Sequence, residues 1–213
     1  MEGALETIQS CRIVAVLRAG EATHLARVAS ALAAAGVRAI EFALTTPGAL
    51  AALEAYAAVA PAEACLGAGT VLTADQARAA IDSGARYLVT PAIVAEVLAV
   101  GVARAVPVLA GALTPTEILH AHRQGASMVK VFPAALGGPA YLRSVRDPLP
   151  DVPLVPTGGV RLADAADYLA AGAVAVGTGS QLTGDALRGG DLGELAARAK
   201  ALVAAVARAC NEG

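Results

Sequence analysis

Short runs of apolar, often β-branched residues alternate along this chain with alanine-rich stretches whose apolar positions follow helical spacing. The runs are nearly continuous in apolar residues, which is typical of strands buried on both faces of a parallel sheet. Eight runs are predicted as strands, at residues 13–17, 39–43, 64–68, 87–90, 107–110, 128–132, 153–156 and 174–177. Helices are predicted between them, for example at residues 22–35, 49–60, 73–83 and 163–171.

Eight strand–helix units without a break in composition predict an α/β protein built as one (β/α)₈ TIM barrel. We expect residues 1–213 to form this single domain, with a short N-terminal helix, since such barrels occur down to about 200 residues. A doubly wound open sheet is the alternative fold. It would usually have fewer strands and a glycine-rich dinucleotide turn after the first strand, and residues 17–20 contain no such turn.

A weak internal repeat supports the barrel. Four segments that each begin with glycine align without gaps, at residues 36–41, 84–89, 125–130 and 172–177. Each glycine is expected to end a helix in the left-handed conformation, with a strand following at once. Thr73 and Thr114 each stand three residues before Gln or Glu, the offset of a helix capping box.

Composition excludes several classes of protein. Hydrophobic residues make up 56% of the chain and mean hydropathy is +0.60, which raises the question of a membrane protein. The longest stretch without a charge, residues 168–184, contains four glycines and lacks the roughly 20 apolar residues of a spanning helix. The acidic N-terminus, residues 1–6, lacks the layout of a signal peptide. We expect no membrane association and a cytoplasmic location.

Neither nucleic acid nor a metal is an expected partner. The net charge is −2 and no block of like charges occurs, so a nucleic-acid surface is not indicated. Cys11, Cys65 and Cys210 are odd in number and widely spaced, which suits neither a disulfide framework nor a zinc site. His120 and His122 stand two apart in a helical pattern and so face different directions. No cofactor is expected either.

Lys130 lies in the middle of a predicted buried strand, although the chain holds only two lysines, Lys130 and Lys200. Burial disfavours the charged form of an amine, and a free amine attacks a carbonyl carbon to give a Schiff base. Arginine, which this chain otherwise uses, stays protonated and does not react in this way. The structural alternative is a lysine on an edge strand that extends its ammonium group to water.

Glu41 occupies the same place in the repeat as Lys130, five residues after the helix-ending glycine. Side chains alternate along a strand, and layers inside a barrel draw from alternate strands. Glu41 and Lys130 are therefore predicted in one inward layer near the C-terminal rim, where barrel enzymes carry their active sites. A buried ion pair adds little net stability, so this pairing favours a function.

Two glycine-bearing loops follow the seventh and eighth predicted strands, at residues 156–160 and 177–180. Barrels commonly bind phosphate at these loops, because glycines let backbone N–H groups approach an anion closely. An isolated Gly-Gly pair is by itself only a tight turn. Residues 67–70 lack the third glycine of a dinucleotide fingerprint. We interpret them as a close backbone approach to substrate, with Thr70 either offering a hydroxyl or capping a helix.

With these features the sequence resembles the 2-keto-3-deoxy-6-phosphogluconate (KDPG) aldolase family, whose members also cleave 4-hydroxy-2-oxoglutarate. The resemblance covers nearly the whole chain and rests on residues 13–18, 36–41, 67–71, 89–91, 129–133, 156–159 and 176–180. It implies a (β/α)₈ barrel, a homotrimer, metal-free class I chemistry without a cofactor, and a phosphorylated 2-keto acid as substrate. It also implies a place in the Entner–Doudoroff pathway.

The resemblance assigns roles to single residues. It implies that Lys130 forms the Schiff base and that Glu41 is the general acid/base. Thr70 resembles part of the carboxylate site, and Pro91 and Phe132 resemble pocket walls. The implied phosphate cradle consists of Gly158, Gly159 and Ser180. Gly179, beside Ser180, is included among the substrate-binding residues.

Three positions bear on how the substrate is bound and chosen. Some members carry an arginine four residues after the catalytic glutamate, which holds the substrate carboxylate, but here that position is Thr45. Thr45 and Thr70 are expected to offer hydroxyls to the carboxylate, but neither supplies positive charge. Arg18 ends the first predicted strand, and we expect it to replace that arginine unless it faces solvent. A threonine before the Gly-Gly pair accompanies gluconate-type substrates in the family and a valine accompanies galactonate types; here it is Thr157.

The sequence therefore predicts a lyase that cleaves KDPG to pyruvate and glyceraldehyde 3-phosphate, and 4-hydroxy-2-oxoglutarate to pyruvate and glyoxylate as an additional reaction. One alternative is an aldolase for the galactonate epimer or for an unphosphorylated keto acid. A second is a phosphate-binding barrel isomerase or synthase that uses the same two loops without a Schiff base. A third is a sugar-phosphate binding protein without catalysis.

Overall fold

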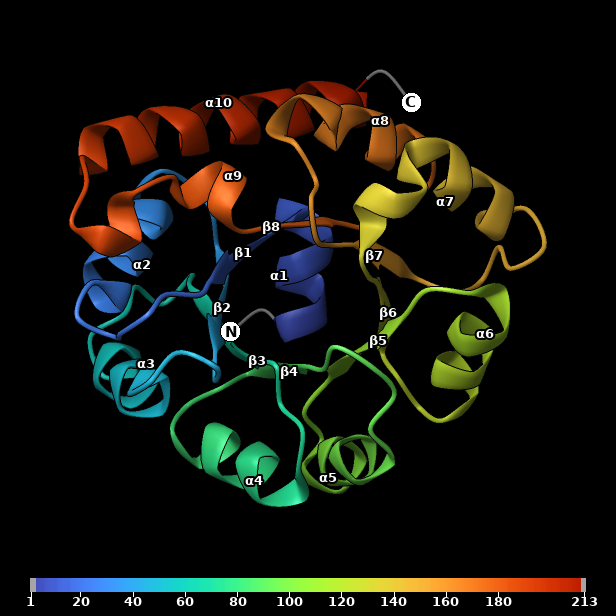
Figure 1. The fold of residues 1–213 in the computed structure, drawn as a ribbon, viewed down its shortest axis with the longest axis horizontal. Coiled ribbons are helices and arrows are strands. Elements are labelled where there is room, and N and C mark those ends of the chain that lie inside the picture. Colours follow the sequence, from blue (N-terminus) through green and yellow to red (C-terminus); the bar gives the residue numbers. More distant parts are fainter. Residues whose placement is uncertain (1–2, 212–213) are drawn as a thin grey trace.

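Eight parallel strands form the centre of the molecule in a computed structural model that describes residues 3–211 (Figure 1). They are β1 (Ile13–Leu17), β2 (Ala39–Ala43), β3 (Cys65–Gly69), β4 (Tyr87–Val89), β5 (Val108–Ala112), β6 (Met128–Val131), β7 (Leu154–Pro156) and β8 (Val176–Thr178). All eight predicted strands occur, and their ends shift by at most two residues. The start of the acidic N-terminus, Met1 and Glu2, and the side chain of Cys210 lie outside the described part.

The strands pair in chain order from β1 to β7, and β8 pairs with β1. Between β7 and β8 the ring is completed by a single parallel bridge, Thr157 with Gly177. A hydrogen bond of 2.9 Å from the Val174 N–H to the Leu154 carbonyl supports the same closure. The predicted barrel is confirmed, and the open-sheet alternative is wrong.

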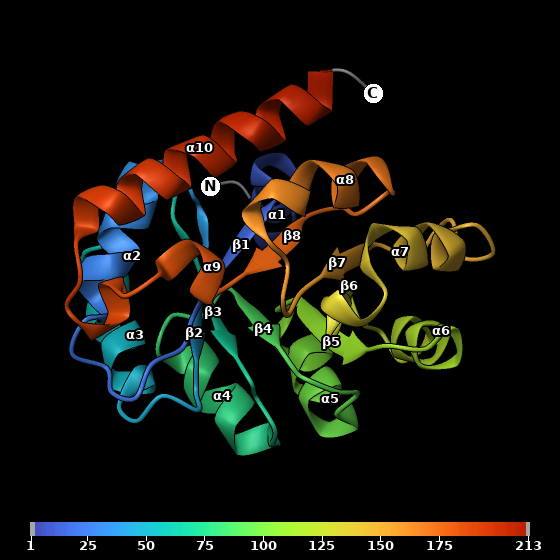
Figure 2. The ribbon, with the colours of Figure 1, turned by 45° about the horizontal axis from the view of Figure 1, so that its top comes forward.

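Helices connect the strands and surround the barrel, except α1, which lies at one end of it (Figure 1). They are α1 (Ala4–Cys11), α2 (Leu25–Ala34), α3 (Ala49–Ala57), α4 (Ala74–Asp82), α5 (Ala95–Arg104), α6 (Pro115–Arg123), α7 (Gly138–Arg146), α8 (Ala165–Ala170), α9 (Ser180–Thr183) and α10 (Leu192–Asn211). Short 3₁₀ turns occur at Ala134–Leu136, Leu162–Asp164 and Ala186–Arg188. The last helix, α10, runs across α2 and α8 on the outside (Figure 2).

The short N-terminal helix α1 is confirmed, and it covers the end of the barrel where the strands begin. Its residue Ile8 is fully buried against the first inward residues of the strands, among them Val14, Ala39 and Met128. This contact seals the N-terminal end with apolar side chains. The C-terminal end, where the strands stop, is left for loops and for any ligand.

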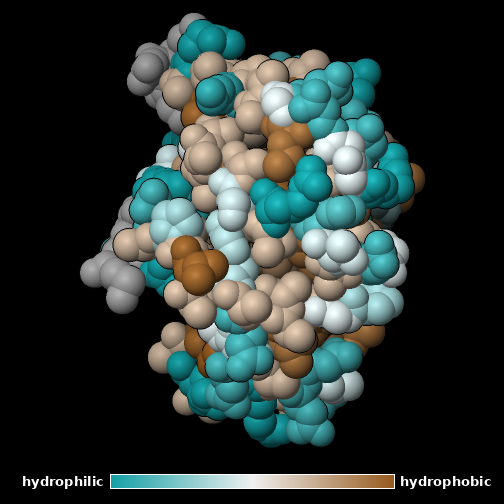
Figure 3. Space-filling model, turned by 90° about the vertical axis from the view of Figure 1, so that its left-hand side faces the viewer, coloured by the Kyte–Doolittle hydropathy of each residue, from teal (hydrophilic) through white to brown (hydrophobic). Residues whose placement is uncertain are grey.

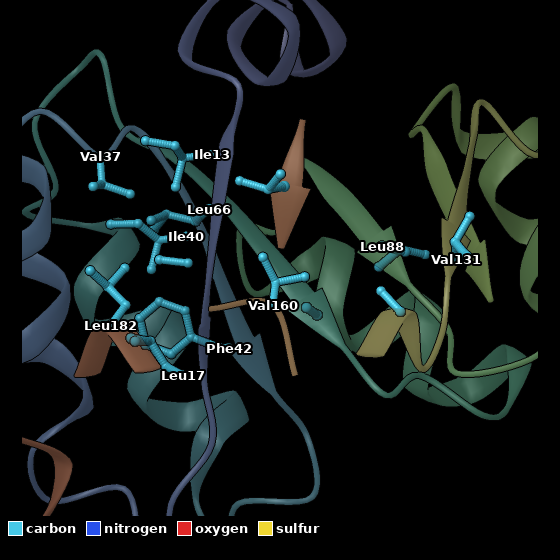
Figure 4. Packing of buried hydrophobic residues seen from close by; sticks show 14 of the residues in the cluster. Ile13, Leu17, Val37, Ile40, Phe42, Leu66, Leu88, Val131, Val160 and Leu182 are labelled. Atoms are coloured by element: carbon cyan, nitrogen blue, oxygen red, sulfur yellow. The ribbon is translucent and has the colours of Figure 1, made fainter. Parts of the chain in front are cut away.

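Apolar side chains fill two layers, as expected when every residue of each strand is buried. The inner layer points into the barrel, and the larger outer layer lies between the strands and the helices. Figure 4 shows part of the outer layer, where Phe42 and Leu17 contact the ring of helices near Leu182. Alternation along each strand thus decides which residues reach the interior.

The four glycines predicted to follow helix ends do so in the left-handed conformation, although the helices predicted at 22–35 and 49–60 are shorter in the structure, at Leu25–Ala34 and Ala49–Ala57. Gly36, Gly84, Gly125 and Gly172 all have positive φ angles, between 92° and 98°, which glycine adopts without steric cost. The predicted capping box at Thr114 is complete, with Glu117 bonding back to the Thr114 N–H. The one predicted at Thr73 is only half formed, because the Gln76 amide oxygen accepts instead from the N–H of Leu72.

On the face formed by α2 and α3, apolar side chains are exposed singly and form no large patch (Figure 3). On the side of α2 and α3, the most hydrophobic residues appear as small separate spots among hydrophilic and weakly hydrophobic ones (Figure 3). Within residues 3–211, no helix combines the length and the apolar character needed to cross a bilayer.

Candidate active site

Lys130 and Glu41 both point into the barrel from opposite parts of its wall. Lys130 lies on β6 with 4% of its surface exposed, and Glu41 lies on β2 with 1% exposed. Two residues before them, Met128 and Ala39 belong to the inner apolar layer, so alternation turns Lys130 and Glu41 inward as well. The shared place in the sequence repeat therefore predicted their orientation correctly.

A cavity of about 260 Å³ opens beside Lys130 at the C-terminal end of the strands. Its lining joins the two glycine-bearing loops to the ends of β1 and β6: Val16, Arg18, Lys130, Phe132, Thr157, Gly158, Gly159, Gly179 and Ser180. All of these except Val16 were predicted from the sequence. The alternation that turns Arg18 inward also turns Val16 inward, and that signal was present in the sequence.

Glu41 is packed against the backbone of β3 and does not line this cavity. A Cβ atom added to Gly69 would lie 1.7 Å from Glu41 Oε1, so only glycine leaves room for the carboxylate. Glu41 Oε1 is buried and has no hydrogen-bond partner among the described residues. A buried carboxylate oxygen without a partner is costly, which is the kind of exception that calls for a functional explanation.

The interpretation of residues 67–70 as a close approach to substrate is wrong for its two glycines. A Cβ atom at Gly67 would lie 2.3 Å from Tyr87 Cζ, and one at Gly69 would meet Glu41. Both glycines make room for side chains of this chain itself. The sequence alone does not reveal which neighbouring strand fills the space over a glycine.

Arg18 and Thr70 are joined by a hydrogen bond, in which Arg18 Nη2 donates to Thr70 Oγ1 over 2.9 Å. Thr70 is buried and has a φ angle of 56°, an uncommon value for a residue with a side chain. The helix that follows is capped by Thr73, so the helix-capping alternative for Thr70 is wrong. Arg18 is exposed at the rim and keeps further N–H groups free to face the cavity.

Two other predicted site residues lie elsewhere. Thr45 is exposed in the turn after β2 and lines neither this cavity nor the next. Pro91 lines a neighbouring cavity of about 240 Å³. Phe132 borders both cavities, and its ring centroid lies 5.2 Å from Lys130 Nζ. Phe132 therefore forms a wall beside the amine.

The loop after β7 has a backbone arrangement suited to an anion. Gly158 and Gly159 have φ angles of 87° and 76°, and side chains there would collide with Phe132 and Ala135. The carbonyl oxygen of Gly158 accepts a hydrogen bond of 3.0 Å from Ala135. Within the described residues, the N–H groups of Gly158 and Gly159 donate to no backbone carbonyl. They remain free to bind an anion in the cavity.

Among the residues that the structure describes, no group of three or more His, Cys, Asp or Glu side chains is placed to bind a metal ion. Within the described residues, neither Cys11 nor Cys65 takes part in a disulfide bond. Burial raises the pKa of the Cys11 thiol, although its hydrogen bonds with the Ile13 and Ala39 backbone act in the opposite direction.

Comparisons with known proteins agree with this geometry. The family of KDPG and KHG aldolases matches residues 5–197. A 2-dehydro-3-deoxy-phosphogluconate aldolase of Treponema pallidum is 40% identical over 170 residues, 78% of each chain. A probable 2-dehydro-3-deoxy-6-phosphogalactonate aldolase of Rhizobium meliloti is 35% identical over 181 residues, 84% of this chain and 85% of that protein.

A solved structure gives the same result. The KDPG aldolase of Legionella pneumophila, crystallised with pyruvate captured as a covalent carbinolamine intermediate, superposes with a TM-score of 0.85. The two proteins are 28% identical, and the match covers 93% of this chain and 97% of that one. Because the family match spans nearly the whole barrel, including both glycine-bearing loops, Lys130 and Glu41, the chain belongs to the KDPG and KHG aldolase family.

Proposed function

We propose that this protein is a class I aldolase that cleaves KDPG to pyruvate and glyceraldehyde 3-phosphate through a Schiff base on Lys130. The observation that carries the proposal is the buried amine of Lys130 beside a cavity whose rim is formed by the glycine-bearing loops after β7 and β8. Membership of the aldolase family supports it.

The reaction begins when Lys130 Nζ attacks the C2 ketone of the substrate and water leaves, which gives an iminium ion. Glu41 then takes the proton of the C4 hydroxyl through a water molecule, and the C3–C4 bond breaks. Its electrons flow into the iminium, so the aldehyde departs and an enamine of pyruvate remains. Glu41 returns a proton to C3, and hydrolysis of the imine releases pyruvate and frees Lys130.

Glu41 suits this double role because it is shielded from bulk water and lies against Gly69. A carboxylate placed in this way accelerates proton transfer by about 10²–10⁴-fold in typical enzymes. Its unpartnered oxygen Oε1 is free to contact the reacting groups or a water that serves them.

The two ends of the substrate are anions, and the site offers a separate partner to each. We assign the phosphate to the free N–H groups of Gly158 and Gly159, with Gly179 and Ser180 completing the cradle. We assign the carboxylate to Arg18 and Thr70, which are already joined by a hydrogen bond. Thr45 is left out of this assignment because it is exposed outside the cavity. Pro91 and Phe132 form the walls around the reacting carbons.

The first prediction tests the Schiff base. Incubation with pyruvate and borohydride should add one reduced pyruvate to the peptide that carries Lys130, as measured by peptide mass spectrometry. Lys200, the other lysine of the chain, is exposed on α10 and serves as an internal control. Lys130→Arg should keep the charge and the fold but lose turnover, because arginine forms no imine.

An adduct on Lys200 alone, or no adduct at all, would contradict the mechanism. The same experiment separates the proposal from its rivals. A phosphate-binding isomerase or synthase, and a binding protein without catalysis, form no imine for borohydride to trap.

The second prediction concerns the substrate carboxylate. Arg18→Met should cost on the order of 2–4 kcal/mol of transition-state binding on KDPG, because a charged hydrogen bond to the carboxylate is lost. An analogue whose carboxylate is reduced to an alcohol should be cleaved by the variant and the unmodified protein at similar kcat/KM. Equal losses on both substrates would instead assign Arg18 to the phosphate or to the fold.

A second candidate substrate is the galactonate epimer, which differs from KDPG in configuration at C4. The relatives include proteins named for both epimers. Thr157 favours KDPG, since its side chain lies inside the barrel over Gly177 and borders the cavity beside Lys130. In this structure its hydroxyl donates to the Val155 carbonyl over 3.3 Å, and we propose that it turns to the C4 oxygen in one configuration only.

The third prediction follows from this position of Thr157. Thr157→Val keeps the shape but removes the hydroxyl, so the ratio of kcat/KM for KDPG to that for the galactonate epimer should fall about tenfold or more. Steady-state assays on both epimers measure it. An unchanged ratio would remove Thr157 from substrate selection.

We further propose cleavage of 4-hydroxy-2-oxoglutarate to pyruvate and glyoxylate as an additional activity, which kinetics on that substrate would test.

From the family resemblance we also propose that the protein is a cytoplasmic enzyme of the Entner–Doudoroff pathway and that it forms a homotrimer. Light scattering of the purified protein at several concentrations tests the trimer, and a monomer at all of them would refute it.

A further inference from the structure

Tyr87 places a phenol inside the barrel, at a position that the sequence motifs did not mark as functional. It begins β4, has no exposed surface and belongs to the inner apolar layer. Its hydroxyl is buried and has no hydrogen-bond partner among the described residues. Buried tyrosine hydroxyls usually find a partner, because an unmade hydrogen bond is destabilising. The position of Tyr87 therefore requires an explanation.

Tyr87 and Glu41 approach β3 from its two sides and lie over neighbouring glycines. The end of the Tyr87 ring occupies the space over Gly67, where a Cβ would lie 2.3 Å from Cζ. Glu41 occupies the space over Gly69, where a Cβ would lie 1.7 Å from Oε1. Gly67 and Gly69 are two residues apart on the same face of one strand, a spacing of about 6.6 Å.

A spacing of this size between the two glycine positions leaves room for one bridging water between the side chains that lie over them. Two O–H···O hydrogen bonds in series span about 5.5 Å, and waters that satisfy buried polar groups in this way are ordinary parts of protein interiors. Both ends need such a partner, since Glu41 Oε1 and the Tyr87 hydroxyl are the two buried polar atoms without one on this face of β3 among the described residues.

The phenol also has the right protonation state. Burial raises the pKa of Tyr87 well above its ordinary value, and electrostatic interactions with Cys65, Glu41 and Cys11 raise it further. Tyr87 therefore keeps its proton across the working range of an enzyme and acts as a donor, whereas an ionised carboxylate is only an acceptor.

We propose that Tyr87 is a positioning residue for Glu41, and that its hydroxyl donates through one buried water to the Glu41 carboxylate. This contact holds the carboxylate over Gly69, aligned with the carbon that it protonates. The inference rests on the proposed aldolase function, because it gives Glu41 its role in proton transfer. Tyr87 itself touches neither substrate nor the reacting atoms.

The test separates imine formation from proton transfer. Both can be followed with pyruvate alone, imine formation by borohydride trapping on Lys130 and proton transfer by NMR of methyl-proton exchange with deuterated solvent. Tyr87→Phe keeps the ring over Gly67 and removes only the hydroxyl. It should slow exchange about ten- to a hundredfold, the size expected for one lost hydrogen bond to a charged group, with trapping unchanged.

A matched control is Tyr56→Phe. Tyr56 on α3 is also buried with an unpartnered hydroxyl, but it lies in the outer layer, with its ring centroid 6.1 Å from that of Phe42. This control should leave exchange unchanged.

A second comparison uses the Glu41→Gln variant. Adding Tyr87→Phe to it should slow exchange no further, because the group that Tyr87 positions is already altered.

Each outcome decides the inference. A methyl-proton exchange rate for Tyr87→Phe within twofold of that of the unmodified protein would overturn the inference. So would a Tyr87→Phe substitution that slows exchange by the same factor in the Glu41→Gln variant as in the unmodified protein. A parallel fall in trapping would show a general structural role instead. If the unmodified protein forms no adduct on Lys130, both the proposed function and this inference fail. If trapping is normal and only the Tyr87 effect is missing, the proposed function stands and this inference fails alone.

Discussion

Moving an ammonium group or a carboxylate out of water costs several kcal/mol per ion unless the charge is paired or neutralised. Lys130 and Glu41 are both buried inside a barrel whose other inward residues are mostly apolar. Stability alone gives no reason for such a pair, since apolar residues of the same size would fill the space as well. The two residues make sense when a substrate supplies the partners: a ketone for the amine, and a hydroxyl and a carbon for the carboxylate.

Glycines on the strands are the means by which the barrel accommodates these side chains. Glu41 lies over Gly69, Tyr87 over Gly67 and Thr157 over Gly177, each in a space that a Cβ atom would fill. Close packing of this kind fixes the position of a side chain more firmly than a loop does. The rim is built differently, since Arg18, Gly158 and Gly159 leave N–H groups free for the charged ends of a substrate.

Much of this arrangement is predictable because the sequence repeat encodes it. The fifth residue after each helix-ending glycine faces inward, and this position alone predicts that Glu41 and Lys130 share the barrel interior. The third residue faces inward as well, and it includes Tyr87, which attention to charged residues overlooks. By contrast, the exposed position of Thr45 depends on the path of the turn after β2. The partner of each strand glycine depends on strand register. Neither is written in local sequence.

If Lys130 and Glu41 act on the same substrate carbons, a trapped adduct on the amine must bring those carbons to the carboxylate. A crystal structure of the protein with the borohydride-reduced pyruvate adduct measures this. We expect the adduct on Lys130 Nζ, with its methyl carbon toward β2 and within reach of the Glu41 carboxylate, either at about 3 Å or through one water. We also expect the adduct's carboxylate on Arg18 and Thr70. An adduct whose methyl carbon faces away from Glu41, with no water between them, would contradict the proposed mechanism.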